Sequence, residues 1–241
     1  MLILPRIRRS ANLWRGHPVI PDMRKYPSRP NELLEEWASR IQVHAAGAVV
    51  DLHYHDSEEW LELQRGKMTF YSLSGQAWPL EAGDVFHIPR GEVHRVDIGD
   101  RGAEYRMYTQ TPPAGVFTSN ALTPGEVELL RRNLEFPLRE ENADGRAAEF
   151  FAAQLSSALA FGRADASVVG KDAFAGGFVA RGRASSGTIC ILNRTENGLL
   201  LSTVVTVGTG SELKAFTNLR LFVREDGAWK CRIWLNYPEP R

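Results

Sequence analysis

The sequence predicts an all-β part followed by an α+β part. A chain of 241 residues can bury one large core or two ordinary ones. Between residues 41 and 111, short runs of Val, Ile, Leu, Phe and Tyr are separated by glycines at intervals typical of a sandwich or barrel. From Thr123 onward, helical segments precede four long strand-like runs.

Composition excludes several classes of partner. Lys+Arg and Asp+Glu both number 29, and the pI is near 7.0, so no long-range attraction to nucleic acid or to an anionic membrane is expected. No stretch has the length of a membrane span, and the basic start lacks a secretory cleavage site. The two cysteines, Cys190 and Cys231, are too few for a disulfide framework and indicate buried thiols, although a single bridge stays open. We therefore expect a cytoplasmic protein with small-molecule partners.

The first thirty residues are rich in proline and arginine. Proline fixes extended backbone and discourages ladder pairing, so residues 1–30 are interpreted as an arm that packs on the body or on a neighbouring subunit. In "SRPNELLEEW", Ser28 as N-cap and Pro30 predict a short helix. Strands are expected to follow up to residue 115.

A linker is predicted at residues 116–122, within the aperiodic stretch "TQTPPAGVFTSNALTP". Thr123 and Glu126 then form a capping box with Pro124 at the first helical position, and Pro137 should end or kink this helix. Two more short helices are expected in "DGRAAEFFAA" and "VGKDAFAGGF". Four strands, joined by turns that include Asn197-Gly198 and Asp226-Gly227, complete the chain: "GTICILN", "GLLLSTVVTV", "LKAFTNLRLFVRE" and "AWKCRIWLNY".

The stretch "GAVVDLHYHDSEEWLELQRG" contains the strongest chemical signal. His53 and His55 are two residues apart and project from the same face of a strand. Glu59 is in phase with the apolar Leu61 and Leu63, which predicts that it points inward. A buried carboxylate is costly unless it is paired, protonated or bound to a cation, so two inward imidazoles beside it indicate a metal. A third histidine comes from "GDVFHIPRGEVHRV".

Residues 41–111 resemble the cupins. The first cupin motif, G-x(5)-H-x-H-x(3,4)-E-x(6)-G, is filled completely by Gly47, His53, His55, Glu59 and Gly66. The second, G-x(5)-P-x-G-x(2)-H-x(3)-N, is filled by Gly83, Pro89, Gly91 and His94, while Ile98 stands where the family usually has asparagine. Both parts have the correct internal spacing, which makes the match specific.

The resemblance implies a jelly-roll β-barrel over residues 31–115, with one divalent transition metal held by His53, His55, Glu59 and His94. Three imidazoles and one carboxylate suit iron, our first choice, and also manganese, nickel, zinc or copper, and they leave one or two positions open. The alternative is a relic site that binds no metal or uses it for stability. His87 and His44 lie near the motifs, and His87 is interpreted as a barrel-wall residue.

Residues 123–241 resemble more weakly the nuclear-transport-factor-like cone fold of ketosteroid isomerases and SnoaL-like cyclases. The features are "NADGRAAEFFAA", "GRADASVVGKDAF" and "LRLFVREDGAWKCRIWLNYP". Such domains are curved sheets wrapped by helices around an apolar pocket, and they are often dimeric. This half has no histidine, and Asp165 and Asp172 have ordinary structural explanations. Asp172 and Tyr237 are the first candidates if this half is catalytic.

Three functions remain open at this stage. The first is a metal-dependent cupin enzyme, most plausibly a dioxygenase acting on a small organic substrate. The second is a non-catalytic module, in which the barrel holds a ligand and the cone supplies dimerisation, so that the chain is a homodimer. The third places isomerase or cyclase activity in the cone, which would require an acidic side chain buried there.

Overall fold

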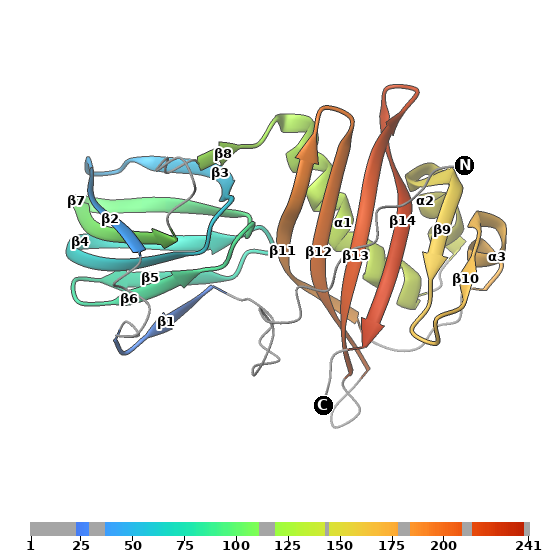
Figure 1. Cartoon of the computed structure of the whole chain (residues 1–241), viewed down its shortest axis with the longest axis horizontal. Helices are drawn as coiled ribbons and strands as arrows, with labels where there is room; N and C mark the ends of the chain where they lie inside the picture. The colour runs from blue at the N-terminus through green and yellow to red at the C-terminus, as the bar shows by residue number, and fades with distance from the viewer. Residues whose placement is uncertain are drawn as a thin grey trace.

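A computed structural model describes residues 23–28, 37–110, 119–142, 145–177, 184–208 and 214–238. These residues form two sheets that lie next to each other, with the helices packed on the second sheet (Figure 1). No helix in these ranges is long and apolar enough to cross a membrane.

The first sheet is built from antiparallel strands and curls around a core of its own. Leu63, Phe70, Phe86 and Met107 are among the buried side chains on its inner face. The long strand β7 pairs with β2, β3 and β4, which brings distant segments of the chain together. The strands are β1 (Arg24–Tyr26), β2 (Trp37–His44), β3 (Val49–His55), β4 (Glu59–Ser72), β5 (Ala77–Glu81), β6 (Val85–Ile88), β7 (His94–Gln110) and β8 (Ser119–Ala121). The all-β prediction for this part is confirmed.

Two segments expected to avoid the sheet belong to it. Within the predicted arm, β1 pairs with β6, because Pro21 and Pro27 flank these three residues without interrupting them. Within the predicted linker, β8 pairs with the end of β3. The rest of the arm, up to residue 22, and residues 29–36 of the predicted short helix lie outside the described residues; Trp37, at the end of that helix prediction, is in β2.

The second sheet has the order β10-β9-β14-β13-β12-β11, and only its β14–β9 pair is parallel. The predicted helices and the four long strands are confirmed. The elements are α1 (Pro124–Asn142), α2 (Gly145–Gln154), β9 (Leu155–Gly162), β10 (Val168–Val169), α3 (Lys171–Ala175), β11 (Ala184–Thr195), β12 (Gly198–Val207), β13 (Lys214–Glu225) and β14 (Ala228–Pro238). Strand β9 was not predicted, because its sequence "LSSALAFG" is dominated by small residues with weak strand preference.

The predicted capping box at the start of α1 is present. The Thr123 backbone N–H donates to Glu126 at 2.7 Å, and the Glu126 backbone N–H donates to the Thr123 hydroxyl at 3.3 Å. Pro137 does not end this helix, which continues to Asn142. The predicted end of the helix at Pro137 is therefore wrong, and the alternative, a kink there, stays a prediction.

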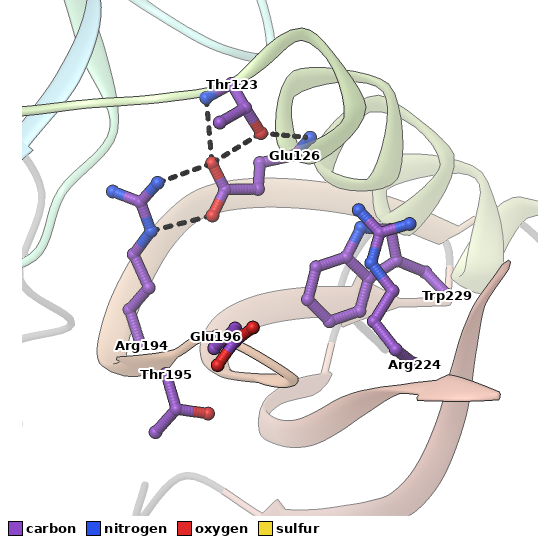
Figure 2. A pocket seen from close by; sticks show the side chains of 7 residues that line it. All are labelled: Thr123, Glu126, Arg194, Thr195, Glu196, Arg224 and Trp229. Carbon is purple, nitrogen blue, oxygen red and sulfur yellow. Dashed lines mark hydrogen bonds and ion pairs between the residues drawn. The ribbon is translucent and has the colours of Figure 1, made fainter. Parts of the chain in front are cut away.

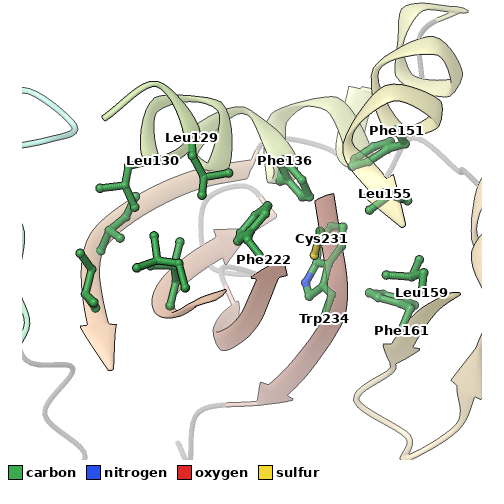
Figure 3. Packing of buried hydrophobic residues seen from close by; sticks show 14 of the residues in the cluster. Leu129, Leu130, Phe136, Phe151, Leu155, Leu159, Phe161, Phe222, Cys231 and Trp234 are labelled. Atoms are coloured by element: carbon green, nitrogen blue, oxygen red, sulfur yellow. The ribbon is translucent and has the colours of Figure 1, made fainter. Parts of the chain in front are cut away.

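The core of the second part lies between the helices and the sheet. Phe136 of α1 and Phe151 of α2 face Phe222 and Trp234 of the sheet, and all four are buried (Figure 3). Cys190 and Cys231 are buried thiols that form no disulfide bond, as expected from the sequence, and burial raises the pKa of Cys231 to about 12. The same apolar cluster includes Tyr54 of β3 and Val93, the residue before β7. The two parts share this core, and their division into separate domains stays a prediction.

The junction between the two sheets includes backbone hydrogen bonds. The Val93 N–H donates to the Ile189 carbonyl at 3.0 Å, and the Ile191 N–H donates to the Gly91 carbonyl at 2.8 Å. Gly91 has a φ of 78°, and a Cβ at this position would lie 2.3 Å from the Ile191 oxygen. Both the left-handed conformation and the close approach to β11 therefore require glycine.

We predict that Gly91→Ala destabilises the protein more than Gly47→Ala. Gly47 has a similar φ of 70°, but nothing lies within 4 Å of a Cβ built there. Both substitutions carry the strain of a left-handed alanine, about 1–2 kcal/mol, and only Gly91→Ala adds the clash with β11. Urea unfolding of the two variants measures the difference; equal losses would show that the backbone junction is not tight.

Candidate metal centre

Three buried histidines meet inside the first sheet. His53 and His55 are on β3, and His94 is the first residue of β7, directly opposite His53 in the register. One nitrogen from each ring lies within 4.8 Å of the other two. Their ring centroids are 4.3 Å apart for His53 and His94 and 5.4 Å apart for His55 and His94. The structure therefore brings together the three histidines that the sequence singled out.

Backbone carbonyls orient two of these rings. His53 Nδ1 lies 2.7 Å from the carbonyl oxygen of Asp51, and His94 Nδ1 lies 2.8 Å from that of Glu92. A carbonyl can only accept, so Nδ1 carries the proton in both rings. Nε2 is then the nitrogen with a lone pair for a metal ion, and fixing of the tautomer by the other nitrogen is typical of metal ligands.

Burial keeps the rings neutral. It lowers the pKa of His53, against a smaller opposite effect of the Asp51 carbonyl. It places the pKa of His94 well below its usual value, and the neighbouring His53 and His55 add to this shift. Neutral imidazoles are the form that binds metals, whereas protonated rings would repel a cation.

Glu59 is the fourth residue of this site and is 1 % exposed. Its Oε1 lies 3.3 Å from Nδ1 of His55, while Oε2 has no hydrogen-bond partner. Burial raises the pKa of Glu59 to about 8, and the charge of Arg40 opposes this shift. The inward orientation predicted from strand phase is thus observed, and the carboxylate is only partly satisfied by the protein.

This donor set fits a divalent transition metal. Ionisation of a buried carboxyl group with an unsatisfied oxygen is costly, and a bound cation would offset that cost. Imidazole nitrogens together with a carboxylate are suitable ligands for zinc, iron, manganese, nickel and copper.

Side chains from β2 add polar groups to the inner face: Arg40, for which the sequence indicated no role, and His44, which was noted only as lying near the motifs. Arg40 is opposite Met107 in the register and lies close enough to Glu59 and Tyr105 to oppose the rise in pKa that burial causes in both. His44 Nε2 lies 3.1 Å from the Tyr105 hydroxyl. Strand alternation alone would place the apolar Ile41 and Val43 inward, but both are exposed, so the sequence carried no signal for Arg40 and His44 on the inner face.

The remaining candidate residues lie elsewhere. His87 forms a 2.6 Å contact with Glu58 and packs against Trp60, so it belongs to the wall of the sheet, as interpreted from the sequence. Asp165 and Asp172 are exposed, and Tyr237 is 49 % exposed. In the described residues of the second part, the one buried carboxylate is that of Glu126, which caps α1 and pairs with Arg194.

A pocket of about 380 Å³ lies at the edge of the second sheet, near the start of α1 (Figure 2). No member of the histidine cluster lines it. Its charged groups are largely engaged with one another, because Glu126 pairs with Arg194 and Arg224 stacks on Trp229 at 4.3 Å. The lining residues are Thr123, Glu126, Arg194, Thr195, Glu196, Arg224 and Trp229.

Residues 40–107 match the family model described as "Cupin domain". This part of the chain is a cupin domain. The match covers β3, β4 and the His94 end of β7, and therefore includes all three clustered histidines and Glu59. No curated protein matches the chain.

Solved structures resemble the chain only distantly. A cupin-2 domain protein from Shewanella frigidimarina has a TM-score of 0.28 at 17 % identity, over 31 % of this chain and 71 % of that one. A salicylate 1,2-dioxygenase from Pseudoaminobacter salicylatoxidans, crystallised with gentisate, has a TM-score of 0.29 at 14 % identity, over 36 % of this chain and 24 % of that one. A calmodulin-dependent kinase II association domain from Exiguobacterium sibiricum, itself an inferred assignment, has a TM-score of 0.36 at 13 % identity, over 50 % of this chain and 99 % of that one. Scores this low say nothing about what this chain binds.

We predict that Glu59→Gln changes how the stability of the metal-free protein depends on pH. In the folded protein Glu59 has a pKa of about 8, against 4.5 for the ordinary group, so unfolding between these pH values releases a proton. The free energy of unfolding should therefore fall as pH rises from about 4.5 to 8. Glutamine cannot titrate, so the variant lacks the contribution of Glu59 to this pH dependence. The contributions of His53 and His94 are present in both proteins. Urea unfolding across this range measures the difference, and identical pH dependence in both proteins would contradict the expectation.

Proposed function

We propose that the cupin domain binds one divalent transition metal ion through His53, His55, His94 and Glu59, and acts on a small organic molecule at that metal. The observation that supports this most directly is the meeting of three buried histidine nitrogens within 4.8 Å. The unsatisfied oxygen of Glu59 and the neutral state of His53 and His94 agree with it.

The chain's own residues have separate roles in this proposal. His53 and His94 present Nε2 because backbone carbonyls hold their Nδ1 protons. Glu59 supplies negative charge to a cation, and its buried position excludes water from the carboxylate. Arg40 contributes positive charge near Glu59 and can attract an acidic group of a substrate.

The reaction class we favour is oxidation of the dioxygenase type with iron. A bound redox-active metal would supply binding and activation of dioxygen and would polarise a coordinated substrate. Catalysis by the second part is not proposed, because Asp172 and Tyr237 are exposed there. The cone assignment and the homodimer stay predictions.

We predict one near-stoichiometric transition metal ion in protein purified without a metal-affinity tag, and its loss in the double variant His53→Ala, His55→Ala. Two of the three clustered imidazoles are removed by this change, and the remaining ligands cannot hold the ion. Elemental mass spectrometry measures the content. The control is His44→Ala, His87→Ala, which removes two histidines outside the cluster and should retain the metal. Absence of metal from the wild type, even after anaerobic incubation with iron, manganese, nickel and zinc, would refute the proposal.

A second prediction separates a reactive centre from a closed structural one. Cobalt(II) bound to the metal-free protein should give visible absorption bands that change when azide is added, because a reactive site keeps an open coordination position. A closed site would leave the bands unchanged. In that case the non-catalytic reading would replace the dioxygenase reading, even though the metal is bound.

A further inference from the structure

Strand β3, which carries two of the three histidines, is held between two neighbours. On one side His53 pairs with His94 of β7, and on the other side His53 pairs with Ala121 and His55 with Ser119 of β8. Strand β8 has only three residues and leads directly into α1. The placement of His53 and His55 therefore depends on what holds this short strand.

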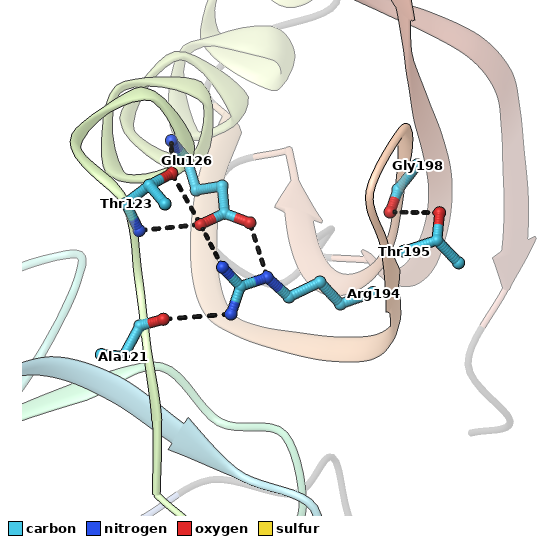
Figure 4. A network of polar contacts seen from close by, with 6 residues as sticks. All are labelled: Ala121, Thr123, Glu126, Arg194, Thr195 and Gly198. Carbon is cyan, nitrogen blue, oxygen red and sulfur yellow. Dashed lines mark hydrogen bonds and ion pairs between the residues drawn. The ribbon is translucent and has the colours of Figure 1, made fainter.

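The side chain of Arg194, from the second sheet, hydrogen-bonds to β8. Arg194 of β11 donates from Nη1 to the carbonyl of Ala121 at 3.0 Å (Figure 4). Its Nε and Nη2 bind the carboxylate of Glu126 at 2.7 and 2.8 Å, so the guanidinium is held in a bidentate pair. Glu126 is itself buried and fixed by the Thr123 cap. The pair with Glu126 therefore fixes the orientation of the planar guanidinium. Its remaining amino group, Nη1, then donates to the backbone of β8.

Arg194 also reaches β3 itself. Tyr54 lies between His53 and His55 and points to the opposite face, where it is 3 % exposed in the core of the second part. Burial raises the pKa of Tyr54, and the nearby Arg194 opposes that shift. The guanidinium therefore hydrogen-bonds to β8 and lies near the residue between the two histidines.

The strand that carries Arg194 also holds the third histidine. Strand β11 pairs with the segment that ends just before His94. Ile189 accepts a hydrogen bond from Val93, and Ile191 donates one to Gly91. The Gly91 N–H in turn donates to the carbonyl of His55 at 2.8 Å. Strand β11 therefore contacts the backbone at two places beside the histidine cluster: at Ala121 of β8 through Arg194, and at Gly91 and Val93 before His94.

We infer that Arg194 is a positioning residue for the metal centre: it fixes His53 and His55 relative to His94 by joining β11 to Ala121 of β8, the strand that pairs with both histidines. This inference rests on the proposed metal site. A metal site tolerates only small displacements of its ligands, so loss of this contact should weaken metal binding although Arg194 touches no ligand. A residue of the second part of the chain thereby positions the metal ligands of the first part.

The test measures cobalt(II) affinity and visible spectrum for the metal-free full-length chain. Arg194→Met removes both the Glu126 pair and the Ala121 contact, and should weaken cobalt binding by about tenfold or more and shift the bands. The matched control is Arg224→Met, which removes another arginine of the same pocket that contacts Trp229 and Gly227 but not β8. It should leave affinity and spectrum unchanged.

Two milder variants cover the case in which Arg194→Met does not fold. Arg194→Lys keeps the charge but cannot bind Glu126 and Ala121 at once, and Tyr54→Phe removes only the hydroxyl; both should show smaller losses of affinity with shifted bands. Wild-type affinity and spectrum in the folded variants would overturn the inference, as would the same loss in Arg224→Met. Failure of the wild-type chain to bind any metal would instead overturn the metal site, and the inference with it.

Discussion

The backbone pairing of Gly91–Val93 with β11 is the contact on which the rest of the structure depends. It joins the curled first sheet to the second sheet, places Val93 in the core of the second part, and leaves His94 as the next residue in the chain. Only glycine fits at the closest point, where a Cβ would lie 2.3 Å from the Ile191 oxygen. The second cupin motif therefore has two roles here: it delivers a histidine to the inner face and it connects the two halves.

Electrostatics explains why the inner face is suited to a cation. His53 and His94 lose their tendency to protonate when buried, and Glu59 holds a proton at neutral pH when no cation is near. The groups are neutral on their own, so the apo site avoids the cost of an isolated buried charge. A divalent ion reverses this balance, because it stabilises the ionised carboxylate and uses the imidazole lone pairs.

The sequence was sufficient for features set by local spacing. Strand alternation placed His53, His55 and Glu59 on one face, the two cupin motifs identified His94, and the capping box located the start of α1. Features set by distant pairing were missed. Strand β8 has no pattern of its own and exists because β3 offers an edge, and Arg194 looks like a surface charge until Glu126, Ala121 and Tyr54 are seen around it. Arg194 is 68 positions from Glu126 and 73 positions from Ala121 in the sequence, so no local pattern could predict these contacts.

The histidine cluster is therefore not a property of the cupin segment alone. A chain ending before Ser119 would keep all four proposed ligands and lose both β8 and β11, the neighbours that hold His53 on one side and the residues before His94 on the other. Its freed edge at β3 would expose unpaired backbone groups beside the site. The predicted boundary near residue 115 stays a prediction, and the contacts that hold β3 beside the histidine cluster cross it, through β8 and Arg194.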